Sequence, residues 1–107
     1  MTTFDKREQA FEAEFVHDEE LKFKAEARRN KMLGLWAAEK LGLSGDAAAD
    51  YSRAVVTAEI DAASEEAVVR KIMSDLAAKG ISLTETDLRT RMSELLAAAV
   101  AQIKAGV

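Results

Sequence analysis

Residues 35–46 read LWAAEKLGLSGD, and this stretch contains the clearest boundary between two helices. An apolar, alanine-rich run ends near Lys40, and Gly42 follows where a helix commonly ends in a left-handed residue. Ser44 is a favourable N-cap residue, and Asp46 adds a negative charge to the first turn of whatever helix follows. The stretch therefore predicts a tight turn between two helices.

Two similar boundaries divide the rest of the chain. Ser64 is followed by two glutamates and begins a third helix, which Gly80 ends. Thr84 and Asp87 resemble a capping box in which Asp replaces the usual Glu or Gln. The absence of proline and the abundance of Ala, Glu, Lys, Leu and Arg also favour helix. We therefore expect an all-α fold, a small antiparallel four-helix bundle with helices over 18–41, 46–63, 65–79 and 85–105.

Apolar residues recur at helical spacing within each of these segments. The third and fourth segments carry the clearest stripes, which are Val68, Val69, Ile72, Met73 and Leu76, and then Leu88, Met92, Leu95, Leu96, Ala99 and Ile103. The second segment offers Tyr51, Val55, Ala58 and Ala62, and the first offers Leu21, Ala25, Met32 and Leu35 or Trp36. These faces are predicted to meet in one core.

The composition of the chain argues against several classes of protein. The chain has 107 residues, 19 acidic and 15 basic side chains, a net charge of -4 and no cysteine. One domain is expected from this length, and disulfides and thiolate metal sites are excluded. No run of apolar residues is long enough to span a membrane, and the negative charge argues against nucleic-acid binding. Acidic residues near the N-terminus argue against a targeting peptide, so a cytoplasmic location is expected.

The N-terminal segment does not match the bundle face of the first helix. Phe4, Phe11 and Phe15 share one narrow helical face, which lies about 90° from the stripe that begins at Leu21. A straight helix cannot bury both faces in one core. We expect residues 1–17 to project as a mobile segment that becomes helical when it docks on a partner, and residues 18–107 to form the bundle. The alternative is that these phenylalanines fold back and cap the bundle.

Catalytic chemistry finds little support in the residues. His17 is the single histidine, and it lacks the converging ligands of a metal site, so no metal or other cofactor is expected. The serines are expected near helix ends or on helix surfaces, without a histidine base beside them. We therefore expect a protein that is not an enzyme.

A basic stretch over residues 22–31 leaves a second function open. Lys22, Lys24, Arg28 and Arg29, together with helix N-termini, could bind an adenine nucleotide weakly and sense the energy state. A third reading is an adaptor whose phenylalanine stripe docks on some other helical partner.

The N-terminal half resembles a known family. FDKREQAFE (residues 4–12), FVHDEEL (15–21), FKAEARRNK (23–31) and LGLWAAEKLG (33–42) are similar to the zeta subunit, the inhibitor of the F-type ATP synthase in alpha-proteobacteria. The resemblance implies a four-helix protein whose N-terminal segment enters a catalytic interface between alpha and beta subunits and reaches toward the rotor subunit, gamma. Such a protein would be peripheral at the inner membrane through the synthase.

Carried onto this chain, the resemblance places the inhibitory segment between Thr2 and about Val16. Our helical-face argument, rather than a family motif, assigns the individual roles within it. The apolar anchors are expected to be Phe4, Phe11 and Phe15, and the polar contacts Lys6, Arg7, Glu8 and Glu12. Wedged between the subunits, such a helix would block the rotation that hydrolysis requires.

Overall fold

The computed structural model describes residues 19–106. They form four helices and no strand, namely α2 (Glu19–Lys40), α3 (Gly45–Ala62), α4 (Glu65–Ala78) and α5 (Glu85–Lys104). The all-α, four-helix prediction is therefore confirmed. The C-terminal end of α2, and both ends of α3, α4 and α5, lie within one residue of the positions predicted from the sequence. The predicted projecting segment, residues 1–17, lies outside the described residues.

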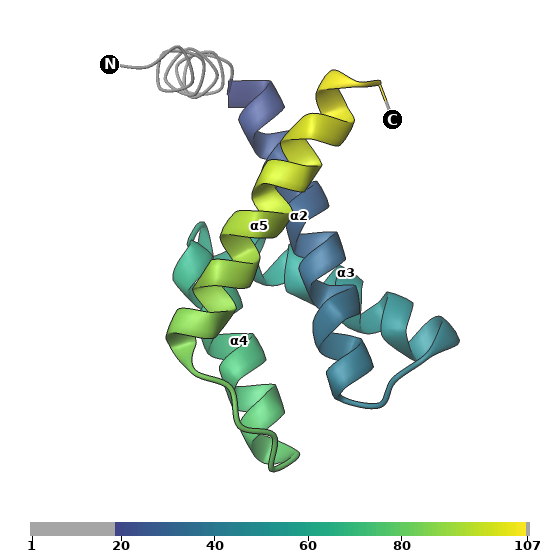
Figure 1. Cartoon of the computed structure of the whole chain (residues 1–107), viewed down its shortest axis with the longest axis vertical. Helices are drawn as coiled ribbons and strands as arrows, with labels where there is room; N and C mark the ends of the chain where they lie inside the picture. Colours follow the sequence, from purple (N-terminus) through teal and green to yellow (C-terminus); the bar gives the residue numbers. More distant parts are fainter. Residues whose placement is uncertain (1–18, 107) are drawn as a thin grey trace.

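Helix α2 is the central element, because it contacts all three other helices and its contacts with α3 and α5 are the most extensive in the fold. In Figure 1, α5 crosses α2 and runs in the opposite direction, and α3 passes behind α2. Helix α4 lies beside the lower part of α5 and also contacts α3. The four helices thus enclose a core around the middle of α2.

The helix ends follow the chemistry of their sequence. Gly42 has a φ of +78°, and the N–H groups of Gly42 and Leu43 donate to carbonyls of the last turn of α2. This is the Schellman arrangement, which glycine adopts without steric strain. The hydroxyl of Ser64 accepts a bond from the Glu66 N–H, and that of Thr84 accepts one from the Asp87 N–H. Both predicted N-caps are therefore confirmed.

Ser44 is different from the other two N-caps. It occupies the N-cap position of α3 with extended backbone, but its side chain makes no capping hydrogen bond. The position of this N-cap was predicted correctly, but the expected hydrogen bond with its side chain is not formed. The turn before α3 depends instead on the left-handed residue that ends α2.

The core draws side chains from all four helices. The largest fully buried apolar side chains are Leu33, Val55, Val68, Val69, Ile72, Leu76, Leu88 and Met92. The predicted stripes on α4 and α5 supply most of them. On α3 the prediction is only partly right, since Val55 is buried but Ala62, at the helix end, is exposed.

The expected stripe on α2 needs a correction. Leu35 is 43% exposed, whereas Leu33, absent from the expected stripe, is completely buried. Met32 and Trp36 do face α5, since Gln102 lies against the Met32 sulfur and Arg91 lies over the Trp36 ring. The prediction found one packing face of a helix that has more than one.

The second packing face of α2 meets α3 at very close range. A Cβ atom added to Gly34 would lie only 2.6 Å from the Cα of Ser52. The hydroxyl of Ser52, a residue expected on the surface, is buried and donates to the Lys31 carbonyl at 2.8 Å. Small residues therefore bring the two backbones into contact, and Gly34 is required for this crossing.

Candidate functional site

The predicted inhibitory residues all precede the described part of the chain. Phe4, Lys6, Arg7, Glu8, Phe11, Glu12 and Phe15 lie outside the described residues, as does His17. The described part of the candidate site therefore begins with the first turns of α2, into which that segment leads.

The first six residues of α2, Glu19–Lys24, contribute little to the core. Leu21 is half-buried and the other five are exposed. Phe23 is 58% exposed, and Lys24 pairs with Glu20 at 3.2 Å across the helix surface. Ala25 is the first buried residue. In Figure 1 these turns rise beyond α3 and α4, with only the last turns of α5 nearby.

The four basic residues proposed for nucleotide binding are not brought together. Lys22 and Lys24 are exposed on the first turns of α2. Arg28 is half-buried and donates to the Gln102 side chain of α5 at 3.4 Å. Arg29 points into the molecule and is 2% exposed. The stretch that reads as one basic block in the sequence is thus divided among three directions.

Arg29 belongs to a buried polar cluster that joins α2 to α3. Its guanidinium lies 3.1 Å from a Glu59 carboxylate oxygen, and its Nε donates to the Asn30 side chain at 2.9 Å. Asn30 donates in turn to the other Glu59 oxygen at 2.7 Å. Glu65, at the start of α4, lies 4.0 Å from the guanidinium. A buried charge needs such partners, and this cluster supplies them.

Glu26 lies one turn before this cluster and is affected by it. Burial raises the pKa of the Glu26 carboxyl, and the negative charge of Glu59 raises it further. The positive charges of Lys22 and Arg29 oppose this shift but do not reverse it. The boundary between the exposed and buried parts of α2 is therefore electrostatically unfavourable for an ionised Glu26.

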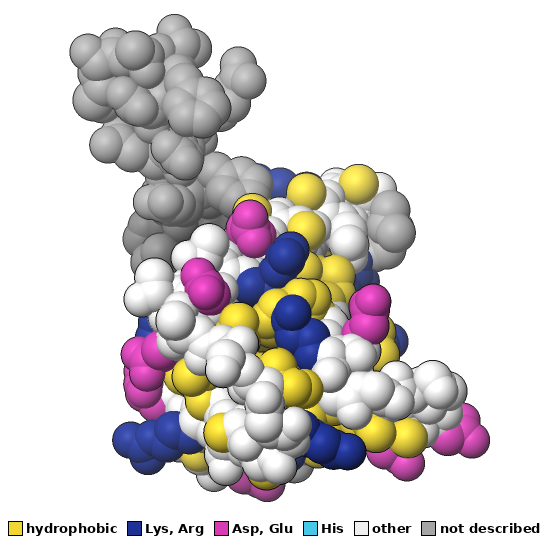
Figure 2. Space-filling model, turned by 60° about the horizontal axis from the view of Figure 1, so that its bottom comes forward, with side chains coloured by type: hydrophobic (Ala, Val, Ile, Leu, Met, Phe, Trp, Pro, Cys, Tyr) yellow, Lys and Arg dark blue, Asp and Glu magenta, His cyan; other side chains and the backbone are white. Residues whose placement is uncertain are grey.

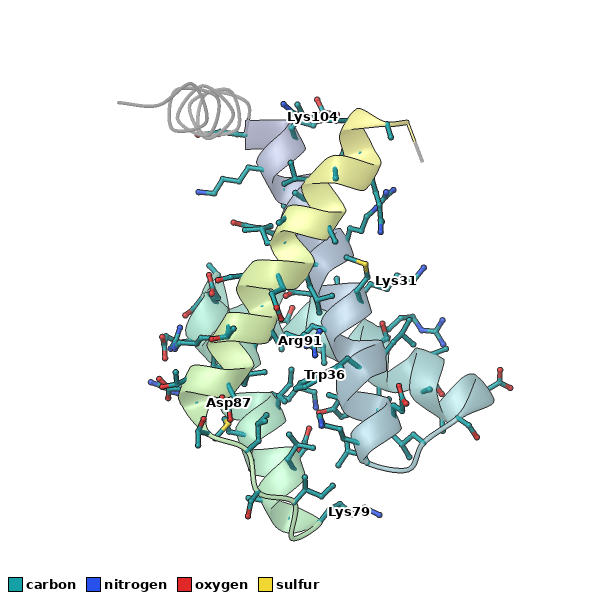
Figure 3. The ribbon with its side chains drawn as sticks, viewed as in Figure 1. Lys31, Trp36, Lys79, Asp87, Arg91 and Lys104 are labelled. Carbon is teal, nitrogen blue, oxygen red and sulfur yellow. The ribbon has the colours of Figure 1, made fainter. Side chains whose placement is uncertain are left out.

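A second group of cationic and aromatic side chains lies toward the other end of α2. The Lys40 ammonium lies 4.9 Å, and the Arg91 guanidinium 5.6 Å, from the centre of the Trp36 ring, between α2 and α5 (Figure 3). In Figure 2, where the bottom of the view in Figure 1 comes forward, apolar atoms are interspersed with Lys and Arg side chains. Such contacts stabilise the half-buried ring, which agrees with a packing role for Trp36.

Tyr51 has a comparable place between α3 and α4. Its hydroxyl donates to Asp75 at 2.7 Å, and Lys71 binds the same carboxylate while its ammonium lies over the Tyr51 ring. Burial and the hydrogen bond to Asp75 raise the pKa of the Tyr51 hydroxyl. A hollow of about 430 Å³ lies along the α4–α5 connection, and neither Tyr51 nor Trp36 lines it.

Two further types of site are absent from the described residues. Within residues 19–106, no three His, Cys, Asp or Glu side chains are grouped so that they could hold a metal ion. None of the helices described is both long enough and apolar enough to cross a membrane.

Comparison with known proteins gives the family. The family model described as ATPase inhibitor subunit zeta matches residues 1–102. A protein solved by solution NMR is 45% identical to this chain, with a TM-score of 0.69, over 81% of this chain and 99% of the other. No curated protein matches. Since the family model covers nearly the whole sequence, the chain belongs to the ATPase inhibitor subunit zeta family, which implies an ATPase-inhibitor role and an ATP synthase partner.

Proposed function

We propose that this protein inhibits ATP hydrolysis by the F-type ATP synthase by inserting residues 1–17 as a helix at an alpha/beta catalytic interface. The observation that carries the proposal is the family match, which includes this segment as well as the bundle. The exposed first turns of α2 agree with it, because they form a helix that leads directly from the segment.

Inhibition of this kind needs no chemistry from the inhibitor. The catalytic interface must open and close as the rotor turns, and a helix held between alpha and beta blocks both movements. Contact with gamma at the tip of the segment would resist rotation directly. Phe4, Phe11 and Phe15 would supply the apolar contacts, with Lys6, Arg7, Glu8 and Glu12 in the polar ones.

The bundle would act as a handle for the segment. Helix α2 is held to α3 by the buried cluster around Arg29 and by the close contact at Gly34. The helix that leads to the segment is therefore fixed in direction by the rest of the fold. Any contact between the bundle and the synthase would also raise the effective concentration of the segment at its site.

The direct test is a titration of ATP hydrolysis by an alpha-proteobacterial F-type ATPase. The full chain is expected to inhibit in a saturable way, and a chain that lacks residues 1–17 is expected to have no effect. A third chain has alanine at the three N-terminal phenylalanines and is otherwise intact. It tests the apolar anchors alone, because the rest of the segment is kept. Equal inhibition by the full and shortened chains would overturn the insertion mechanism, and no inhibition by the full chain would overturn the function.

The adenine-nucleotide alternative has less support in the structure. Arg29 is engaged in a buried cluster, and Arg28 is directed toward α5. Lys22 and Lys24 remain on the surface at the exposed start of α2, away from the hollow along the α4–α5 connection. Titration with ATP, followed by amide NMR shifts, separates the two functions, because nucleotide binding predicts shifts confined to residues around these lysines.

A further inference from the structure

We infer that the surface that binds the ATP synthase continues past the N-terminal segment into α2, with Phe23 as an anchor in an apolar pocket of the alpha and beta subunits. This inference rests on the proposed function and extends it to a residue of the described structure. Three large apolar side chains are exposed among residues 19–106, namely Phe23 (58%), Ile60 (55%) and Leu35 (43%). Phe23 is the largest and the most exposed of the three.

Within residues 19–106, the fold provides no reason for a phenylalanine at this position. Successive helix residues are rotated by about 100°, so Phe23 lies about 200° around the helix from Ala25. Ala25 is 1% exposed and marks the side of α2 that packs inside the bundle. Phe23 is therefore on the outer side, where a polar residue would normally stand.

The position of Phe23 along the chain identifies its partner. Phe23 is six positions from residue 17, which would be about 9 Å along the axis of a helix that continues to that residue. A protein that encloses residues 1–17 must therefore come close to this side chain. The first turns of α2 extend beyond α3 and α4 (Figure 1), so these two helices do not cover Phe23.

Helical geometry also relates Phe23 to the predicted anchors. If α2 continues toward the N-terminus in the bound state, eight residues separate Phe15 from Phe23, which corresponds to about 80° around the helix. Both then fall within an apolar arc of about 100°. A helix wedged between two subunits is contacted on more than one side, so the two phenylalanines can be bound together.

The neighbours of Phe23 match the anatomy of an interface anchor. Lys22 and Lys24 are exposed on either side in the sequence, and Glu20 pairs with Lys24. An aromatic side chain surrounded by charged residues is the usual arrangement of a buried hot spot and its polar rim. The pocket on the synthase is accordingly expected to be apolar, with carboxylates at its edge opposite Lys22.

Alanine substitutions at the three exposed apolar residues test the inference with matched controls. Phe23→Ala is expected to raise the concentration that half-inhibits ATP hydrolysis by about tenfold or more. Leu35→Ala, on the same helix, and Ile60→Ala, on α3, are expected to leave it unchanged. Phe23→Leu should retain much of the inhibition, because it keeps an apolar side chain. Circular dichroism on each variant checks that the four-helix fold is intact.

The outcomes separate this inference from the function on which it rests. If the full chain inhibits and the chain without residues 1–17 does not, but Phe23→Ala inhibits like the full chain, the inference about Phe23 is wrong and the function stands. The same conclusion follows if Leu35→Ala and Ile60→Ala weaken inhibition as much as Phe23→Ala. If the full chain does not inhibit at all, both proposals fall.

Discussion

The first six residues of α2 and the remainder of the helix have opposite roles in the fold. Residues 19–24 place only Leu21 partly inside the molecule, whereas residues 25–40 contact the rest of the fold along their length. In the second part Leu33, Ala37 and Ala38 are completely buried, and even an arginine is enclosed. One continuous helix thus changes from a surface element to the central element of the fold within one turn.

The difference in burial between the two parts of α2 has two causes, composition and the positions of the other helices. Composition accounts for part of it, since residues 19–24 (EELKFK) are mostly charged and residues 33–38 (LGLWAA) carry no charge. The second part is held because other helices lie on several sides of it, and the first part is exposed because those helices have ended or turned away (Figure 1). We therefore expect substitutions of the buried residues from Ala25 onward to be costly for stability, and substitutions of the exposed residues before it to be nearly neutral.

The largest contrast is expected between Leu33→Ala and Phe23→Ala. Leu33 is completely buried, so its truncation leaves a cavity and should lower the free energy of unfolding by about 3–4 kcal/mol. Phe23→Ala should change it by less than about 0.5 kcal/mol, since the side chain is mostly exposed. Urea unfolding followed by circular dichroism measures both. A large loss for Phe23→Ala would show that this side chain supports the fold after all.

The next contrast is between two ion pairs of α2. Arg29→Met leaves Glu59 and Asn30 without their buried partner and should lower stability by about 3 kcal/mol. Lys24→Met removes an exposed pair with Glu20 and should change stability by less than about 0.5 kcal/mol. Adding Glu59→Gln to Arg29→Met should recover part of the loss, because it removes the uncompensated charge. Equal effects of the two single substitutions would contradict the buried character of the cluster.

Gly34→Ala tests the contact between α2 and α3. Alanine favours helix more than glycine does, but its Cβ would meet the Ser52 backbone, so a net loss of about 2 kcal/mol is expected. Leu35→Ala, at the next residue, is exposed and serves as the control in the same unfolding experiment. A gain in stability for Gly34→Ala would mean that the two helices can separate without loss.

The smallest effect is expected at Glu26, where the two parts of α2 meet. Because the folded state raises the pKa of this carboxyl, folding favours its protonated form, and the ionised form lowers stability at neutral pH. Glu26→Gln should therefore stabilise the protein at pH 7 by a few tenths of a kcal/mol, a small figure because solvent screens the site. The gain should shrink as the pH falls toward the ordinary glutamate value of 4.5. Thermal unfolding at several pH values gives the comparison.

Much of the fold could be predicted from local sequence signals. Gly42 and Gly80 end helices, and Ser64 and Thr84 begin them through the bonds expected of N-caps. These interactions involve residues within one turn of each other, so the sequence contains all their participants. The stripe on α4 was equally clear, because this helix buries a single face.

The packing of α2 could not be predicted in the same way. Its expected stripe offered Leu35 or Trp36, of which Trp36 packs against the core and Leu35 is exposed, and it omitted Leu33, which is buried. Arg29 was read as a surface charge and Ser52 as a surface serine, yet both are buried with partners from another helix. Each partner lies 21 or more residues away in sequence. No periodicity within one segment contains that information.

The four helices and their ends can be predicted from the sequence alone, because caps, glycine positions and local spacing act over a few residues. The buried faces of α2, the need for glycine at position 34 and the interior position of Arg29 become visible only in the folded protein. So does the exposed position of Phe23. The physical reason is that burial depends on where the other helices cross α2, and those crossings are set by contacts between distant parts of the chain.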